Sequence, residues 1–235
     1  MKLRKIGMIV AMAALATMMV AAPASAGKPG GGGGGGGGLV KNPILFVHGW
    51  NSSASTWNTM VSRFEADGWP AGYLNSWSYN TSQSNATTAQ EVLARVNDII
   101  ASTGATKVDI ISHSMGGLSS RHCIKFTGCD TKIDAWVSLG GPNHGTDTAY
   151  WCFSQACYDM RPGSSFLNNL NAGDETPGTS TRWRTWWSPC DSVINPDSSV
   201  SLSGATNTKT ACIGHSDLHT DATVYGQVRD FVASQ

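Results

Sequence analysis

The stretch that decides the fold is Val108-Asp-Ile-Ile-Ser-His-Ser-Met-Gly-Gly-Leu118. Val108, Ile110 and Ile111 form a short β-branched apolar run, which is typical of a buried strand. Residues 117–126 fit a helix, so a tight Ser-His-Ser-Met-Gly turn has to join the two elements. Such a turn lifts the hydroxyl of Ser114 clear of the sheet and points the helix N-terminus at it.

This strand, turn and helix together have the pattern of a nucleophile elbow. The turn is so tight that the residues two before and two after the serine must be small. Gly116 meets that demand, whereas Ser112 stands where the motif usually has glycine. An ordinary turn between a strand and a helix is the alternative, but the elements on both sides favour the elbow.

Outward from this stretch, apolar runs of strand type alternate with amphipathic helical patterns. Strands are predicted at 43–48, 73–77, 108–111, 133–139, 182–187 and 209–213, and helices at 55–67, 87–102, 117–126 and 217–233. Residues 143–181 are predicted to form loops with short helices. The alternation favours an α/β fold, a mostly parallel sheet with helices on both faces. In such a sheet, side chains that follow the strands gather at one edge.

The N-terminal segment has the pattern of a signal for export. A basic start precedes an apolar run from Ile6 to Ala22, and an Ala-Ser-Ala sequence ends at Ala26. The pattern predicts a signal peptide over 1–26, with a membrane anchor as the alternative. Nine consecutive glycines predict a flexible leader over 27–40, and one catalytic domain fills 41–235.

Charge and cysteine content narrow the function further. Cleavage after residue 26 leaves 13 basic and 16 acidic side chains, a net charge of −3 that disfavours nucleic-acid binding. Six cysteines in an exported chain are expected to pair. No Cys-x-x-Cys is present, so a zinc site is not expected. Spacing favours Cys123–Cys129 and Cys152–Cys157 as local pairs, which leaves Cys190 and Cys212.

Several motifs together carry a family resemblance. They are Phe46-Val-His-Gly-Trp50, Ser112-His-Ser-Met-Gly-Gly117, Leu139-Gly-Gly-Pro-Asn-His-Gly-Thr146, Cys190-Asp191 and Gly214-His215. With them the chain resembles the α/β-hydrolase superfamily, and within it the small secreted bacterial lipases without a large lid. The resemblance covers residues 43 to about 232, and the order Ser, Asp, His along the chain is the order of that family.

The resemblance implies a secreted carboxylic ester hydrolase, most simply a triacylglycerol lipase. It would act through an acyl-enzyme, with neither cofactor nor metal, as a monomer that does not insert stably in a membrane after signal cleavage. A short-chain esterase, a polyester hydrolase and an acyltransferase are alternatives within the enzyme class. A catalytically silent exported binding protein of the same fold is the alternative from another class.

The expected catalytic residues are Ser114, His215 and Asp191. A serine hydroxyl needs a histidine base, which a carboxylate holds in one tautomer. His215 follows the last predicted strand, where the fold has its base, and His219 is the alternative. Asp191 follows the strand at 182–187, and Asp197 is the alternative.

The remaining histidines are expected elsewhere. His48 belongs to a loop after the first strand, His122 lies on the helix after the elbow, and His144 could line the site. His113 is adjacent to the nucleophile, but its side chain is expected to point away.

Two backbone N–H groups are expected to bind the oxyanion of the tetrahedral intermediate. They are those of Met115, the residue after the nucleophile, and Trp50, in the loop after the first strand. Gly49 allows that loop to approach closely. Several aromatic residues are candidates to line an acyl groove, although each alone is more simply a core or surface residue. They are Trp50, Trp57, Trp77, Tyr79, Tyr150 and Trp151.

The last two cysteines flank the expected acid and base. Cys190 directly precedes Asp191, and Cys212 comes three residues before His215. If the carboxylate and the imidazole form a hydrogen bond, the two chain segments must lie close together. The cysteines are then within reach of a disulfide, which would hold the spacing of acid and base.

Overall fold

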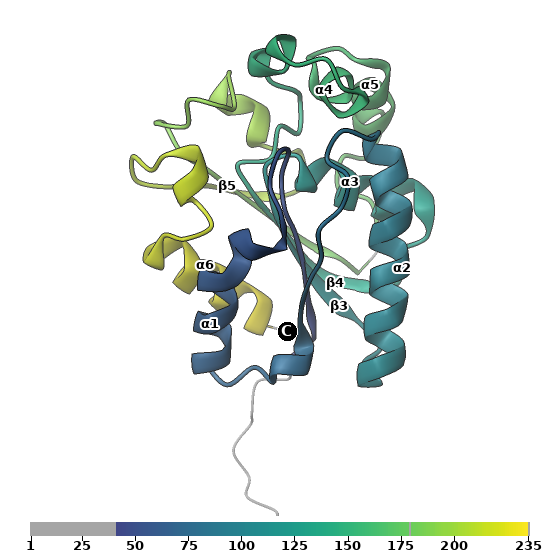
Figure 1. Cartoon of the computed structure of the whole chain (residues 1–235), viewed down its shortest axis with the longest axis vertical. Helices are drawn as coiled ribbons and strands as arrows, with labels where there is room; N and C mark the ends of the chain where they lie inside the picture. Colours follow the sequence, from purple (N-terminus) through teal and green to yellow (C-terminus); the bar gives the residue numbers. More distant parts are fainter. Residues whose placement is uncertain (1–40, 179, 235) are drawn as a thin grey trace, which may run out of the picture. The chain divides into compact units, whose positions relative to one another are not determined.

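The computed structural model describes residues 41–178 and 180–234. The signal peptide and glycine-rich leader expected over 1–26 and 27–40 lie outside the described residues. Figure 1 shows a central sheet with helices on both of its faces.

The sheet has six strands in the order β2-β1-β3-β4-β5-β6, and every pair of neighbours is parallel. The strands are β1 Ile44–Val47, β2 Leu74–Ser76, β3 Val108–His113, β4 Ile133–Leu139, β5 Arg182–Trp187 and β6 Thr206–Lys209. β1 and β3 are buried along their whole length, which explains their unbroken apolar character. The parallel sheet expected from the sequence is therefore confirmed.

Side chains of the central strands alternate between two cores. Ile44 and Phe46 pack with helices α1 (Asn58–Ala66) and α6 (Ala222–Ala233). Leu45 and Val47 point to the other face, toward α2 (Asn85–Thr103). Helix α3 (Gly116–His122) lies on this second face as well, beside α2 (Figure 1). This two-residue period buries both faces of β1, so the helices cover the sheet completely there.

Short helices complete the described chain. Two of them, α4 (Gln155–Met160) and α5 (Ser165–Asn171), lie together at one end of the molecule, at the top of Figure 1. The 3-10 turns span Ala54–Trp57, Ala71–Tyr73, Asp147–Trp151, Asp197–Val200 and His215–Asp217, and a π-helical turn spans Cys123–Thr127. Within the described ranges, no segment forms a large lid domain. No described helix is long and apolar enough to span a bilayer.

Two elements at the C-terminal end differ from the sequence prediction. The last strand is Thr206–Lys209, not 209–213, and the closing helix begins at Ala222, not at 217. β6 is an edge strand with polar side chains, so its sequence lacks the apolar run from which a strand is predicted. Asp221 caps α6 by accepting a hydrogen bond from the backbone N–H of Val224, which fixes its start.

Candidate active site

The turn after β3 has the geometry expected of a nucleophile elbow. Ser114 has a φ of +54°, a left-handed conformation that is rare for residues other than glycine. A Cβ on Gly116 would collide with the backbone carbonyl oxygens of Val47 and His48. The helix after the turn therefore approaches β1 so closely that only glycine fits at this position.

Ser112 departs from the motif without disturbing the turn. Its side chain is fully buried, and its hydroxyl donates a 2.6 Å hydrogen bond to the carbonyl oxygen of Val137 on β4. The polar group thus has a partner inside the sheet, and serine is small enough to replace glycine here.

The imidazole of His215 is held by the carboxylate of Asp191. Nδ1 of His215 donates to Oδ2 of Asp191 over 2.7 Å. The other carboxylate oxygen accepts 2.9 Å hydrogen bonds from the backbone N–H groups of Val193 and Ile194. Asp191 therefore has three donors around a nearly fully buried side chain. No such contact joins His215 to Asp197, which begins a separate 3-10 turn.

Ser114 and His215 line the same pocket. In the described structure their side chains form no hydrogen bond with each other. Contacts between a nucleophile and its base are often long before substrate binds and tighten in the complex. The structure thus brings the three expected residues to one place, with the contact between acid and base already formed.

The loop after β1 lies directly against Ser114. A Cβ built on Gly49 would come within 2.8 Å of the Cβ of Ser114. Among the hydrogen bonds of the described loops, none is donated by the backbone N–H of Trp50 or of Met115. The two N–H groups expected to bind an oxyanion thus have no partner among these hydrogen bonds, and their role stays a prediction.

His113 does not point away from the site, contrary to the sequence expectation. Its side chain is buried, and Nε2 donates a 2.9 Å hydrogen bond to the backbone carbonyl oxygen of His215. The two imidazole rings are 4.7 Å apart. His113 is the last residue of β3, and its side chain packs against the loop that carries His215. Sequence reasoning missed this residue because the partner is a backbone atom about one hundred positions away.

His219 lies behind His113 and is no substitute for His215. The rings of His113 and His219 are 4.6 Å apart, and Nε2 of His219 bonds with the hydroxyl of Thr56 over 2.8 Å. No carboxylate contacts His219 within the described residues. Burial lowers the pKa of His219 and lowers that of His113 far more, and the neighbouring imidazoles lower both further. Both rings are thus kept neutral beside His215.

Three other histidines have structural partners. Nδ1 of His48 donates to its neighbouring backbone carbonyl, and its ring stacks on Tyr79 at 4.1 Å. His122 stacks on Phe166. His144, expected as a possible lining residue, instead pairs with Glu175 over 2.7 Å and does not line the pocket.

The pocket at Ser114 has a volume of about 470 Å³ and a mostly apolar lining. Its apolar lining residues are Trp50, Ala149, Trp151, Met160, Val193 and Ile194. Of the aromatic candidates, only Trp50 and Trp151 line it. Trp57 and Trp77 belong to the two cores, and the hydroxyl of Tyr79 donates to the carbonyl oxygen of His48. The pocket can take an apolar chain beside Ser114.

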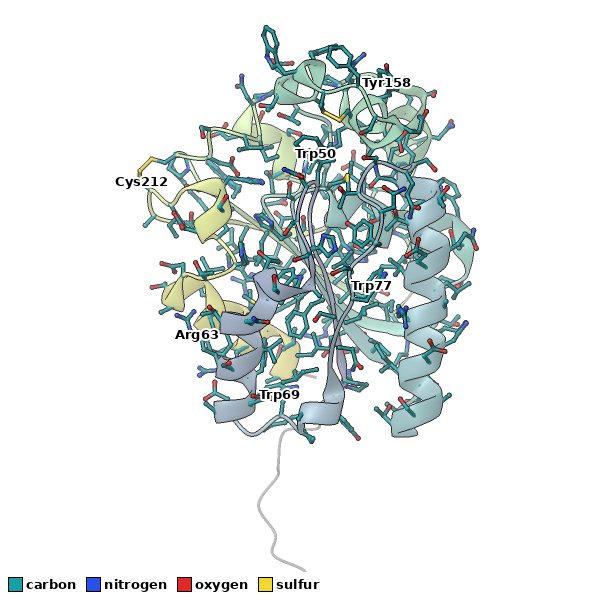
Figure 2. All side chains as sticks on the ribbon, in the orientation of Figure 1. Trp50, Arg63, Trp69, Trp77, Tyr158 and Cys212 are labelled. Carbon is teal, nitrogen blue, oxygen red and sulfur yellow. A yellow bond between two sulfur atoms is a disulfide. The ribbon has the colours of Figure 1, made fainter. Side chains whose placement is uncertain are left out.

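Three disulfides join all six cysteines: Cys123–Cys129, Cys152–Cys157 and Cys190–Cys212. The third has a Cα–Cα distance of 5.0 Å and connects the segments that carry Asp191 and His215. Cys212 lies at the periphery of the molecule, on the side of α6 (Figure 2). The link therefore braces the acid and the base from outside the pocket.

Relatives of known structure share this fold. Mature Bacillus licheniformis lipase BlEst2 superposes with a TM-score of 0.73 at 18% identity, over 82% of this chain and 92% of that one. Aspergillus fumigatus lipase B gives 0.69 at 17% identity, over 83% of this chain and 53% of that one. The α/β-hydrolase fold expected from the sequence is confirmed.

Sequence comparison agrees with the fold. A triacylglycerol lipase of Pseudarthrobacter phenanthrenivorans is 26% identical over 113 residues, 46% of this chain and 35% of that protein. One of Burkholderia plantarii is 27% identical over 113 residues, 46% of this chain and 31% of that protein. The match thus spans about a third of these relatives. Residues 41–229 match the family described as Lipase (class 2), and the chain belongs to that family.

Proposed function

We propose that this protein is an exported carboxylic ester hydrolase that cleaves lipid esters through an acyl-enzyme. The observation that carries the proposal is that His215, which donates a hydrogen bond to Asp191, lines one apolar pocket together with Ser114. Membership of a lipase family and the similarity to triacylglycerol lipases support a lipid ester as substrate.

In the first half of the reaction, the hydroxyl oxygen of Ser114 attacks the carbonyl carbon of the ester. A C–O bond forms, and the serine proton moves to Nε2 of His215. Asp191 keeps the proton of the imidazole on Nδ1 before the attack and stabilises the imidazolium after it. The backbone N–H groups of Met115 and Trp50 donate to the oxyanion.

The tetrahedral intermediate then collapses. The bond to the leaving alcohol breaks, and His215 returns its proton to the alcohol oxygen, which leaves an acyl group on Ser114. Water repeats the sequence: its proton moves to His215, its oxygen bonds to the acyl carbon, and the carboxylic acid leaves as Ser114 is reprotonated. Only side chains, backbone N–H groups and water take part in this scheme.

Ser114→Ala tests the mechanism directly. We expect hydrolysis of a soluble p-nitrophenyl butyrate to fall by roughly 10⁴-fold or more, with an unchanged melting profile. Ser119→Ala is the matched control, because Ser119 is a buried serine of α3 outside the pocket. A fluorophosphonate should label Ser114 in the wild-type protein, as mass spectrometry of its peptides would reveal. An unchanged rate in Ser114→Ala would refute the acyl-enzyme.

Chain length separates a lipase from a short-chain esterase. The apolar lining of the pocket favours long acyl chains, so emulsified triolein should be hydrolysed as well as soluble short-chain esters. Initial rates on the two substrates measure the preference. Activity confined to soluble short-chain esters would make the protein an esterase without changing the roles of the triad.

Export is part of the same proposal. We infer that residues 1–26 are a cleaved signal peptide, 27–40 a leader and 41–235 the catalytic domain, which acts outside the cell as a monomer. The three disulfides support an oxidising environment. N-terminal sequencing of the protein from the culture medium should begin at Gly27, and sedimentation velocity should give one monomeric species.

A further inference from the structure

Exposed aromatic side chains lie at the pocket and along the chain segment that continues from it. Six large hydrophobic side chains are exposed in the described residues, and all six are aromatic. Five of them come from two segments that each contribute to the lining of the pocket at Ser114, namely Trp50 and the stretch 150–158. Those of the stretch are Tyr150, Trp151, Phe153 and Tyr158. Scattered surface aromatics need no explanation, but a cluster at one opening marks an interaction surface.

The cluster is continuous with the catalytic pocket. Trp50 and Trp151 line the pocket and are also exposed to solvent, Trp151 at 86%. Phe153, 77% exposed, lies two residues further along the chain. In Figure 2, Tyr158 lies at the outer end of the molecule, beyond Trp50, on the side toward which the strands lead. A partner seated on these side chains would therefore face the opening that leads to Ser114.

The stretch is held in this exposed position by its own contacts. The Cys152–Cys157 disulfide closes it, and Ser154 caps α4. Arg161 donates hydrogen bonds to the carbonyl oxygens of Ala149 and Cys152. Because the backbone is held in this way, it needs little further ordering when the aromatic side chains bind.

The chemistry of the surface selects an uncharged partner. Residues 148–158 contain no charged side chain. The nearest cation, Arg161, has its guanidinium over the rings of Tyr150 and Tyr158, at 5.2 and 4.5 Å. The nearest acid on α4, Asp159, is buried against Asn85. Tyrosine and tryptophan suit a boundary between apolar and aqueous phases, since each has an apolar body and a polar tip.

We propose that Trp50 and residues 150–158 form a docking surface for uncharged lipid aggregates, such as acylglycerol droplets. The surface rests on the proposed function, since it brings the pocket mouth to a layer of ester groups. Binding transfers the exposed rings from water into the lipid, and the disulfide keeps them in position for that transfer.

The test separates lipid binding from catalysis. Binding is measured on the Ser114→Ala protein by flotation with triolein droplets, and turnover is measured on soluble p-nitrophenyl acetate with Ser114 intact. We expect Phe153→Ala to lower the droplet partition coefficient by about tenfold, because one exposed phenylalanine no longer enters the lipid. Turnover of the soluble ester should be unchanged, since Phe153 does not line the pocket.

Phe126→Ala is the matched control, because Phe126 is 53% exposed but lies on the turn after α3, outside both segments. It should leave partitioning unchanged. Equal partitioning of Phe153→Ala and the parent, or an equal loss in Phe126→Ala, would overturn the proposal. So would preferential binding to anionic phospholipid vesicles, or dimerisation that Phe153→Ala abolishes. Droplet binding without any ester hydrolysis would instead overturn the proposed function and leave the surface standing.

Discussion

Two aspartates with buried side chains lie at opposite ends of the sheet. The side chain of Asp191, after β5, is 1% exposed, and the whole of residue Asp109, near the start of β3, is 1% exposed. Both oxygens of Asp191 accept hydrogen bonds, and one partner is His215. At Asp109, Oδ1 accepts from Asn42 and from the backbone of Ala135, whereas Oδ2 has no partner within the described residues.

The comparison shows that burial alone does not prepare a carboxyl group to pair with an imidazole, because a buried carboxyl group without enough donors becomes protonated. Burial raises the pKa of Asp109 to about 8, and the nearby Asp134 adds to the rise. Asp109 is therefore mostly protonated at neutral pH. Asp191 has three donors directed at its two oxygens, and such donors take the place of water around a carboxylate. Hydrogen-bond partners, supplied by the loop at 193–194 and by His215, distinguish the two sites.

Removing the charge of Asp191 should have the largest effect. Asp191→Asn lets the amide stand in the place of the carboxylate but removes its ability to hold Nδ1–H of His215 and stabilise the imidazolium. We expect kcat on a soluble ester to fall by about 10³–10⁴-fold. Asp197→Asn is the control and should remain near the wild-type rate. The reverse ranking of the two variants would assign the acid to Asp197.

Replacing the carboxyl group of Asp109, at the other end of the sheet, should change stability, not catalysis. The folded-state pKa of Asp109 lies near 8, above the ordinary value of 3.8. Its contribution to stability is therefore complete below about pH 4 and is lost as the pH rises toward 8. In the wild type, the free energy of unfolding should therefore fall between pH 5 and pH 8, on the order of a few kcal/mol. Asp109→Asn should lack this part of the decrease. Urea unfolding at both pH values measures it; parallel wild-type and variant pH dependences would contradict it.

The Cys190–Cys212 disulfide tests whether the pairing of Asp191 with His215 depends on a covalent brace. Cys190→Ala/Cys212→Ala opens a loop of 22 residues, for which the chain-entropy model gives about 3 kcal/mol of stability. We expect a lower Tm together with a kcat reduced up to about tenfold, as Asp191 and His215 lose their spacing. Cys123→Ala/Cys129→Ala should lower Tm while kcat stays unchanged. Equal kcat in the two double variants would show that the Cys190–Cys212 disulfide has no role in catalysis beyond stability.

His113 offers the finest test, because it acts on the backbone of His215 and not on its ring nitrogens. His113→Leu removes the hydrogen bond to the carbonyl oxygen of His215, and we expect kcat to fall by about tenfold while KM changes little. His113→Gln keeps a side-chain N–H donor at similar reach and should recover part of the rate. Equal rates in both variants would show that packing, not the hydrogen bond, is what matters at this position.

Most of the fold could be predicted because its signals are local. The strands at 133–139 and 182–187 have the predicted bounds, since each is an apolar or aromatic run. β6 could not be placed, because an exposed edge strand such as Thr206–Lys209 needs no apolar side chains. The start of α6 depends on the cap at Asp221. The helical pattern of the sequence continues on the N-terminal side of this cap, so it predicted too early a start.

The residues of the candidate site could be predicted where the order of the strands fixes their position. They could not be predicted where their position depends on how loops pack. Ser114, Asp191 and His215 follow strands whose carboxyl ends meet at one edge, so their meeting place follows from topology. The contacts of His113 with His215 and His219 depend on how a loop folds over β3, which no spacing in the sequence encodes. The separation of His144 from the pocket likewise depends on its partner Glu175.

The left-handed backbone at Ser114 has a consequence for how this chain can evolve. A φ of +54° is a conformation that glycine adopts freely and serine adopts under strain. The elbow would therefore be more stable with glycine at this position, yet that chain would have no hydroxyl to react. At this position, selection for thermostability alone would favour glycine, whereas selection for activity would favour serine. The left-handed conformation of the turn therefore imposes a trade-off between stability and activity.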